Sequence, residues 1–400
     1  MRNITGAVAE GADFFNRTSE MAKFWRDLDT DNLLLPAPRR VGKTSLMRRM
    51  AAESAAHGFT TIFVDVSDCA DELRFVQRLY SEILDSSSGD HLWKRISESA
   101  FGKTVQRIQK MGGAGFSLEF APDATSWARL GEELADALSR LEQRWLIQID
   151  ELPVFVLKLL DQGTPAERTR VREFLYWMRR LRQQYTKVRW MLAGSIGLDT
   201  VTARLNIADA INDLHIEKLG AFDVETADAM LRELSSANSV GLSKEVRHYI
   251  ITRTGWPAPY YLQLIFHELR DAKGPVVEAD VDRAIEDLLS PQHRNYFDYW
   301  RQRLFEELGN ADADFAKTLL NNCCRTSDGA TRGTLSLALA GGIVDPAARE
   351  DKLRYLLDVL QNDGYVVESE KHWQFRSPLL REYWLRRVAP PVDLKPEALK

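Results

Sequence analysis

Cysteine is scarce in this chain of 400 residues, which carries only Cys69, Cys323 and Cys324. An odd number with one adjacent pair forms no disulfide framework, and the ligand spacing of a zinc site is missing. There is no run of about 18 apolar residues to span a membrane. The first residues lack the apolar core of a signal peptide. We therefore expect a cytoplasmic protein in a reducing compartment, with no membrane partner.

An excess of positive charge is absent as well. The formal net charge is −5, so no global field attracts nucleic acid or anionic lipid. Hydrophobic residues make up 44% and charged residues 28% of the chain, as in an ordinary globular protein. A chain of this length exceeds what one core usually organises, which predicts two or three domains.

The first part of the chain, residues 1–222, alternates short β-rich segments with helical patterns. Strands separated by long helices predict an α/β fold, with a parallel sheet covered by helices on both faces. A long helical insert, residues 71–141, separates the second predicted strand from the third. The predicted strands are Leu33–Leu35, Thr60–Val66, Trp145–Ile149, Val188–Ala193 and His215–Leu219.

The pattern becomes all-helical from residue 223, and we expect residues 223–290 to form a small helical lid domain. Its predicted helices are Val224–Asn238, Lys244–Arg253, Pro259–Asp271 and Glu278–Leu288. Residues 291–388 begin with a linker and continue with helices and two β-rich segments, Tyr365–Glu368 and His372–Phe375. A hairpin after helices is the outline of a winged helix. The Pro-rich residues 389–400 are expected to be a loose tail.

The central motif is a phosphate loop. Residues 37–44, APRRVGKT, fit the pattern G-x-x-x-x-G-K-[ST] except that Ala37 replaces the first glycine. Such a loop turns backbone N–H groups towards phosphate oxygens, and the helix that follows adds the positive end of its dipole. We expect Lys43 to reach the β- and γ-phosphates of a nucleotide and the Thr44 hydroxyl to bind Mg²⁺. The motif follows an apolar strand and precedes a helix, as this chemistry requires.

A second motif, residues 146–151 (LIQIDE), places two carboxylates at the end of a buried strand. The carboxyl end of such a strand lies beside the phosphate loop in a doubly wound sheet. We predict that Asp150 holds Mg²⁺ through water and that Glu151 orients or polarises the attacking water. An acidic turn after a strand is common by itself, and the phosphate loop favours the catalytic interpretation. Gln148 is unusual in this apolar strand.

Two further polar segments are weaker candidates. Ser195 follows the next apolar strand, where it could sense the γ-phosphate or position water, and an ordinary turn is the alternative. Thr254–Pro257 (TGWP) begins a helix in the lid region. Pro257 could touch the nucleotide and link its state to the lid, whereas a simple turn between two helices is the alternative.

A basic segment precedes the fourth predicted strand. A solvated basic face is the first interpretation, and an arginine acting in trans or a partner contact is the alternative. The segment enters the strand that leads to Ser195, so we expect its end near the nucleotide. One of Arg179, Arg180 and Arg182, with Arg180 as the candidate catalytic residue, would then reach the γ-phosphate of a neighbouring subunit. The segment's basic residues are Arg168, Arg170, Arg172, Arg179, Arg180, Arg182, Lys187 and Arg189, offset by Glu167 and Glu173.

With these residues in place, the chain resembles the STAND-like ATPases of the archaeal-ATPase type, in the AAA+-related branch of P-loop proteins. Asn16 and Trp256 stand where that family usually has glycine. The similar stretches are Phe14–Arg17, Pro38–Leu46, Ile149–Glu151, Ala193–Ser195, Thr254–Pro257 and Phe375–Arg381. The resemblance implies nucleotide binding by Pro38, Arg39, Arg40, Val41, Gly42, Lys43, Thr44, Ser45 and Pro257, with Thr44 and Asp150 on the metal.

The resemblance also implies ATP and Mg²⁺ as cofactors and a nucleotide-dependent switch. ATP hydrolysis to ADP and phosphate would be slow or stimulated by a partner. Such proteins often assemble, and they often serve signalling, defence or transcription.

Two interpretations of the output compete. The favoured one is a switch that acts through a protein partner or a homo-oligomer, and the alternative is an ATP-gated DNA-binding regulator. The predicted recognition helix, Arg349–Gln361, is nearly neutral, which suits phosphate contacts poorly. A nucleotide kinase would share the phosphate loop, but the winged helix and the large helical region disfavour it.

Overall fold

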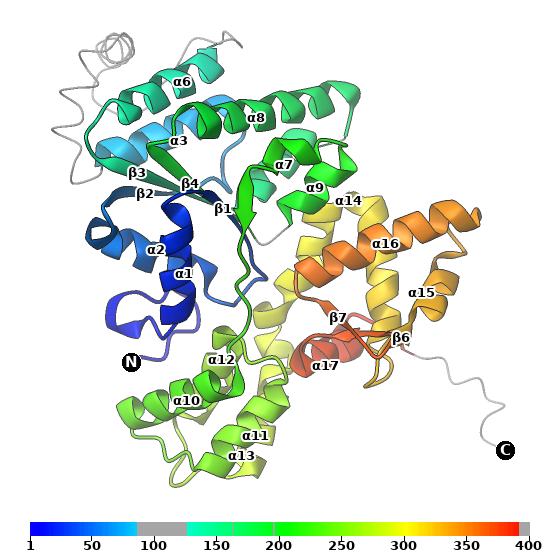
Figure 1. The fold of residues 1–400 in the computed structure, drawn as a ribbon. Helices are drawn as coiled ribbons and strands as arrows, with labels where there is room; N and C mark the ends of the chain where they lie inside the picture. The colour runs from blue at the N-terminus through cyan, green and yellow to red at the C-terminus, as the bar shows by residue number, and fades with distance from the viewer. Residues whose placement is uncertain (86–125, 162, 195–196, 392–400) are drawn as a thin grey trace, which may run out of the picture. The chain divides into compact units, whose positions relative to one another are not determined.

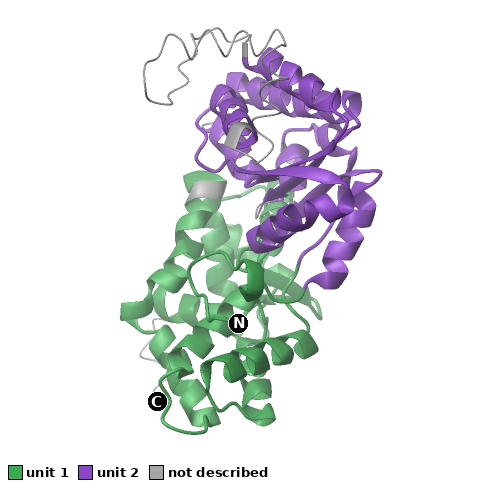
Figure 2. Cartoon of the chain, turned by 90° about the vertical axis from the view of Figure 1, so that its left-hand side faces the viewer, with its two compact units in different colours: residues 1–16, 38–42, 220–400 green, residues 17–37, 43–219 purple. Residues whose placement is uncertain are grey.

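The computed structural model of the chain describes residues 1–85, 126–161, 163–194 and 197–391. These residues pack as two compact units (Figure 2). The helical unit contains residues 1–16, 38–42 and 220–400, and the sheet unit contains residues 17–37 and 43–219. The units change at residue 220, and the boundary predicted at 222/223 stays a prediction. The boundary predicted at 290/291 lies inside the helical unit and stays a prediction.

The sheet unit is built on five parallel strands in the order β2-β3-β4-β1-β5 (Figure 1). The predicted parallel sheet is therefore confirmed, with strand ends that differ from the prediction by a few residues. The strands are β1 (Asn32–Pro36), β2 (Phe59–Asp65), β3 (Arg144–Asp150), β4 (Val188–Gly194) and β5 (Leu214–Ile216).

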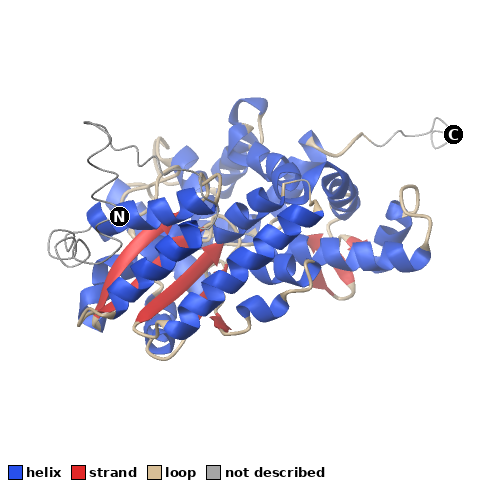
Figure 3. Ribbon diagram, turned by 90° about the horizontal axis from the view of Figure 1, so that it is seen from above, coloured by secondary structure: helices blue, strands red, loops and turns tan. Residues whose placement is uncertain are grey.

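Helices cover both faces of this sheet, which explains the apolar run in β1. Leu33, Leu34 and Leu35 are all buried, because a parallel sheet covered on both sides has no solvated face. Helices α1 (Thr18–Leu28) and α2 (Lys43–Glu53) lie on one face (Figure 1). Figure 3 shows helices in blue packed over the red strands, seen from above. The opposite face carries α3 (Glu72–Asp85), α6 (Ser126–Ser139) and α8 (Pro165–Gln184). The sheet unit also contains α7 (Leu152–Leu160), α9 (Leu198–Arg204), η2 (Ser54–His57) and η3 (Ala208–Ile211).

The register of the strands brings the predicted site segments to one edge. Pro36 at the end of β1 pairs with Gly194 at the end of β4. Asp65 at the end of β2 pairs with Asp150 at the end of β3. The phosphate loop after β1 and the acidic residues after β3 therefore emerge at the carboxyl edge of the sheet.

The helical unit contains helices at the positions predicted for residues 223–290, and their identity as a separate lid domain stays a prediction. The helices of this bundle are α10 (Val224–Asn238), α11 (Lys244–Thr254), α12 (Pro259–Leu269) and α13 (Glu278–Leu288). A short η4 (Pro291–His293) leads into α14 (Asn295–Cys323), which is kinked at Gly309, where φ is 71°. A short η1 (Gly11–Asp13) lies near the start of the chain.

The rest of the helical unit contains α15 (Arg332–Leu339), α16 (Pro346–Asn362) and α17 (Pro378–Arg387). Strands β7 (Val366–Ser369) and β8 (His372–Phe375) form the predicted hairpin after the helices. The short β6 (Ala330–Thr331) pairs with β8, giving a three-stranded antiparallel sheet.

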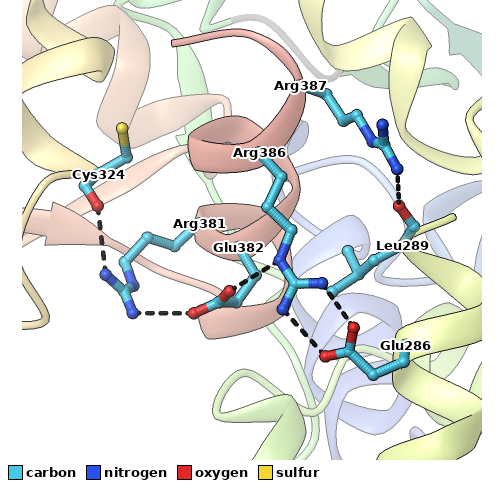
Figure 4. A network of polar contacts seen from close by, with 7 residues as sticks. All are labelled: Glu286, Leu289, Cys324, Arg381, Glu382, Arg386 and Arg387. Carbon is cyan, nitrogen blue, oxygen red and sulfur yellow. Dashed lines mark hydrogen bonds and ion pairs between the residues drawn. The ribbon is translucent and has the colours of Figure 1, made fainter. Parts of the chain in front are cut away.

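Polar contacts tie α17 to the helical bundle (Figure 4). The Arg386 guanidinium forms two hydrogen bonds with the Glu286 carboxylate on α13, at 2.7 and 2.9 Å. Arg387 donates to the Leu289 carbonyl at 3.1 Å. The bundle and the hairpin-bearing region are therefore joined within one unit.

Among the described residues, no helix combines the length and apolarity that crossing a membrane requires.

Candidate functional site

The start of α2 and the end of β3 meet through four polar side chains. Lys43 forms ion pairs with Asp150 and with Glu151, and its Nζ lies 2.9 Å from Glu151 Oε1. The Thr44 hydroxyl donates to Asp150 Oδ2 at 2.6 Å. The backbone N–H of Glu151 donates to Asp150 Oδ1 at 3.0 Å. The structure thus brings together the four residues predicted to handle phosphate, metal and water.

This cluster is withdrawn from solvent, which strengthens its electrostatics. Lys43 is 7% exposed and Asp150 is 1% exposed. Burial by itself would lower the pKa of the Lys43 ammonium, but the charges of Asp150 and Glu151 outweigh it and raise the pKa above its ordinary value. Lys43 therefore stays a cation across the physiological pH range.

The backbone of the loop has the conformations that an anion-binding turn needs. Gly42 has φ 91°, a value that glycine adopts without steric cost. Arg40 has φ 70°, which is uncommon for a residue with a side chain. The Ala37 N–H donates to the Gly194 carbonyl at 3.1 Å, so Ala37 continues the pairing of β1 with β4. Alanine suits position 37 because the residues with positive φ, Arg40 and Gly42, come later in the loop.

The donor set fits a magnesium nucleotide. The Thr44 hydroxyl and the Asp150 carboxylate offer adjacent hard oxygen ligands, which Mg²⁺ prefers. Lys43 supplies a point charge beside them. The loop residue Arg39 also keeps a buried Nε–H with no hydrogen-bond partner among the described residues, a donor suited to an anionic group.

The contacts of Gln148 explain in part why a polar residue occurs in this apolar strand. It is fully buried in β3, two residues before Asp150, and so projects to the same face of the strand. Its Nε2 donates to the sulfur of Met191 on β4 at 3.7 Å. Its Oε1 has no partner among the described residues, which leaves a buried acceptor next to the acidic end of β3.

The remaining predicted binding residues are placed as follows. Val41 is buried, while Pro38 and Ser45 are half-buried. Pro257 lies in the helical unit, in the turn between α11 and α12, where its carbonyl accepts from the Phe222 N–H at 3.2 Å. Ser195 lies outside the described residues. The roles predicted for these residues stay predictions.

The expectation that the end of the basic segment lies near the nucleotide is wrong. Lys187, between α8 and β4, accepts a hydrogen bond at 3.1 Å from Trp145, at the start of β3. The end of α8 therefore lies at the amino edge of the sheet, opposite Asp150. A helix that connects two parallel strands must return to the starting edge, which the sequence argument overlooked.

The three arginines at this end also have partners of their own. Arg182 is 3% exposed and forms two hydrogen bonds of 2.8 Å with the Asp213 carboxylate. Arg179 forms an ion pair with Asp209 at 3.4 Å, and Arg180 forms one with Glu132 at 3.3 Å. Arg182 is thus a structural residue. A role of Arg180 towards a neighbouring subunit stays a prediction, without the geometric argument.

Sequence reasoning missed the partners of Arg40. Its guanidinium lies over the rings of Tyr260 and Tyr299, both in the helical unit, as is Arg40 itself. Tyr260 lies three residues after Pro257 in the sequence, which was the available signal. Nothing in the sequence around Tyr299 points to the loop.

Comparisons with solved structures agree on the fold. The Walker-type ATPase PABY2304 of Pyrococcus abyssi matches with a TM-score of 0.64 and 19% identity, over 96% of this chain and 100% of that one. The ORC2 protein of Aeropyrum pernix, in ADPNP–ADP complexes, matches with a TM-score of 0.56 and 13% identity. That match covers 94% of this chain and 95% of that one. The fold is that of a P-loop NTPase.

No protein-family model matches the sequence, and no curated protein sequence matches it. At these identities, the structural likeness concerns the fold alone. The chemistry of this chain therefore depends on its own residues at the site.

Proposed function

We propose that this protein binds ATP with Mg²⁺, hydrolyses it to ADP and phosphate, and works as a switch through a protein partner or self-association. The observation that carries the proposal is the buried cluster in which Lys43 and Thr44 both bond to Asp150. This pairing of a loop lysine and hydroxyl with a strand-end carboxylate suits phosphoryl transfer, where positioning and charge provide most of the catalysis.

The residues divide the work by their chemistry. Lys43 is the cation for the β- and γ-phosphates, and Thr44 and Asp150 are the oxygen ligands for Mg²⁺. The metal, when bound, would neutralise charge that develops on the phosphate oxygens. Glu151 accepts a hydrogen bond from water and orients it for attack. Ser195 and Pro257 are proposed as further contacts to the nucleotide.

The contacts of α16 support the protein-partner interpretation over DNA binding. Lys352 donates to Asp312 at 2.7 Å, and Arg354 forms an ion pair with Asp351 at 3.4 Å. Arg332 on α15 forms an ion pair with Glu350. Cations neutralised within the protein contribute little to binding DNA phosphates. Together with the resemblance to STAND-like ATPases, this favours a switch that signals to proteins.

The first prediction tests the site through Lys43→Ala. We expect this variant to lose tight ATP binding in isothermal titration calorimetry, because it removes the charge that meets the phosphates. Arg49→Ala is the matched control: it removes a partly exposed cation of the same helix, paired with Glu53. The control should bind ATP like the wild-type protein.

Thermal unfolding of each variant separates lost binding from lost folding, because Lys43→Ala leaves two carboxylates without their cation. Unchanged ATP affinity in a folded Lys43→Ala protein would refute the site. Salt-dependent DNA binding that requires ATP would instead support the alternative, an ATP-gated DNA-binding regulator.

A further inference from the structure

Arg40 of the phosphate loop is held between two aromatic rings. Its Cζ lies 3.9 Å from the centre of the Tyr260 ring on α12 and 4.6 Å from the centre of the Tyr299 ring on α14. Among the described residues, no carboxylate forms an ion pair with Arg40. Planar guanidinium groups stack on aromatic faces, so the two rings restrict where this side chain can lie.

The stacking acts on a loop residue whose backbone conformation is strained. A φ of 70° is rare for a residue with a Cβ, and it persists only where the surroundings hold it. The two rings provide such a restraint through the side chain of the same residue. The conformation of the loop between Ala37 and Lys43 is therefore linked to the positions of Tyr260 and Tyr299.

A second contact holds the same loop. Gly364, in the turn before β7, approaches Pro38 so closely that an added Cβ would lie 2.8 Å from Pro38 Cβ. The same Cβ would lie 3.5 Å from the Trp256 ring, next to Pro257 in the lid turn. Two neighbouring loop residues, Pro38 and Arg40, are thus packed against the helical unit.

Buried aromatic contacts extend from this point into the hairpin-bearing region. Tyr261 and Trp300 follow Tyr260 and Tyr299 in the sequence, and Trp300 Nε1 donates to the Tyr261 hydroxyl at 3.1 Å. The Tyr365 hydroxyl donates to the Trp300 carbonyl at 2.6 Å, just before β7. Phe297 on α14 stacks on Tyr383 of α17 at 5.0 Å. A shift of Tyr260 or Tyr299 would therefore be transmitted through these packed rings to the hairpin-bearing region.

We propose that Tyr260 and Tyr299 are positioning residues for the phosphate loop, which hold it through Arg40 and pass its nucleotide state to α12 and α14. This inference rests on the proposed nucleotide binding and adds the route by which the helical unit responds.

The test compares ring-removing and ring-keeping variants of the full chain. Hydrogen–deuterium exchange of α12 and α14 is measured without nucleotide, with ADP and with a non-hydrolysable ATP analogue. In the wild-type protein, we expect the analogue to slow exchange in both helices. Tyr260→Leu combined with Tyr299→Leu should abolish this difference and weaken analogue affinity about tenfold. The corresponding Phe variants should keep both, because the ring does the stacking.

Arg40→Gly separates positioning from direct phosphate binding. Glycine accepts the positive φ but offers no guanidinium. We expect this variant to bind the analogue within about tenfold of wild type, while α12 and α14 no longer respond. A loss of affinity as large as that of Lys43→Ala would make Arg40 a direct ligand and overturn the positioning role.

Tyr249→Leu is the matched control. Tyr249 lies on α11, and its hydroxyl donates to the Asp282 carboxylate on α13. This variant should respond like wild type. Wild-type responses in the double Leu variant would overturn the inference and leave the proposed function intact. If the wild-type protein binds no nucleotide, the proposed function fails and the inference falls with it.

Discussion

At the scale of the residue, the position of the Glu151 carboxylate depends on its backbone conformation and on its ion pair with Lys43. It has φ 57°, in the left-handed region, directly before α7. Its side chain remains 18% exposed, whereas the Asp150 side chain is almost fully buried. Asp150 is therefore suited to hold a metal, and Glu151 to meet a water molecule from solvent.

This difference leads to the second prediction. Glu151→Gln should bind ATP normally and hydrolyse it about 10²-fold more slowly, because the amide keeps the shape and loses the basic oxygen. Calorimetry gives the binding, and phosphate release gives the rate. Glu173→Gln, an exposed change on α8, serves as the control. Wild-type turnover in Glu151→Gln would remove Glu151 from catalysis.

The sequence predicted that the phosphate-loop residues and the acidic residues after β3 lie together, whereas the contacts around the loop could not be predicted. Lys43 and Thr44 follow a motif with its own spacing, and Asp150 and Glu151 end a strongly apolar strand. Local sequence patterns of this kind can be recognised without knowledge of the fold. The contact of Arg40 with Tyr299 joins segments more than half the chain apart, and tertiary packing alone creates it.

At the scale of the element, α8 shows why the end of the basic segment was placed at the wrong edge of the sheet. Thr164 and Glu167 form a capping box that starts the helix, and Pro165 occupies its first turn. The sequence therefore specifies the helix well. The direction in which the helix crosses the sheet follows from the parallel pairing of β3 and β4, a property of three elements together.

The third prediction concerns Arg182, which joins α8 to the segment between η3 and β5. Besides its two bonds to Asp213, it donates to the Ala210 carbonyl at 2.8 Å. Arg182→Ala would leave a carboxylate without its cation and should lower the free energy of unfolding by about 3 kcal/mol. Arg180→Ala, at an exposed ion pair, should change it by less than about 1 kcal/mol. Urea unfolding measures both.

Equal stabilities of the two variants would contradict the structural role of Arg182. The same two variants also test whether an arginine of α8 acts on the nucleotide of a neighbouring subunit. A loss of the concentration dependence of ATPase activity in Arg180→Ala, with its stability intact, would support a contact with a neighbouring subunit.

At the scale of the whole molecule, the proposed switch should change the protein's assembly or its partners. Light scattering coupled to size exclusion should give a larger mass with a non-hydrolysable ATP analogue than with ADP. The physical reason is that only the analogue would bring a γ-phosphate to the proposed site at Lys43. Lys43→Ala should give the same mass with both nucleotides.

An unchanged mass in the wild-type protein would exclude self-association as the output. The switch would then depend on a different protein as its partner, which pull-down experiments with the same two nucleotides can compare.

The phosphate loop belongs to both compact units, which matters when fragments of the protein are prepared. Residues 38–42 pack with the helical unit, while Lys43 begins a helix of the sheet unit. A fragment that ends before residue 220 would keep every residue of the motif and lose both rings that hold Arg40. The loop would then be free to relax from its positive φ. Nucleotide affinities of such a fragment would describe an untethered loop rather than the intact protein.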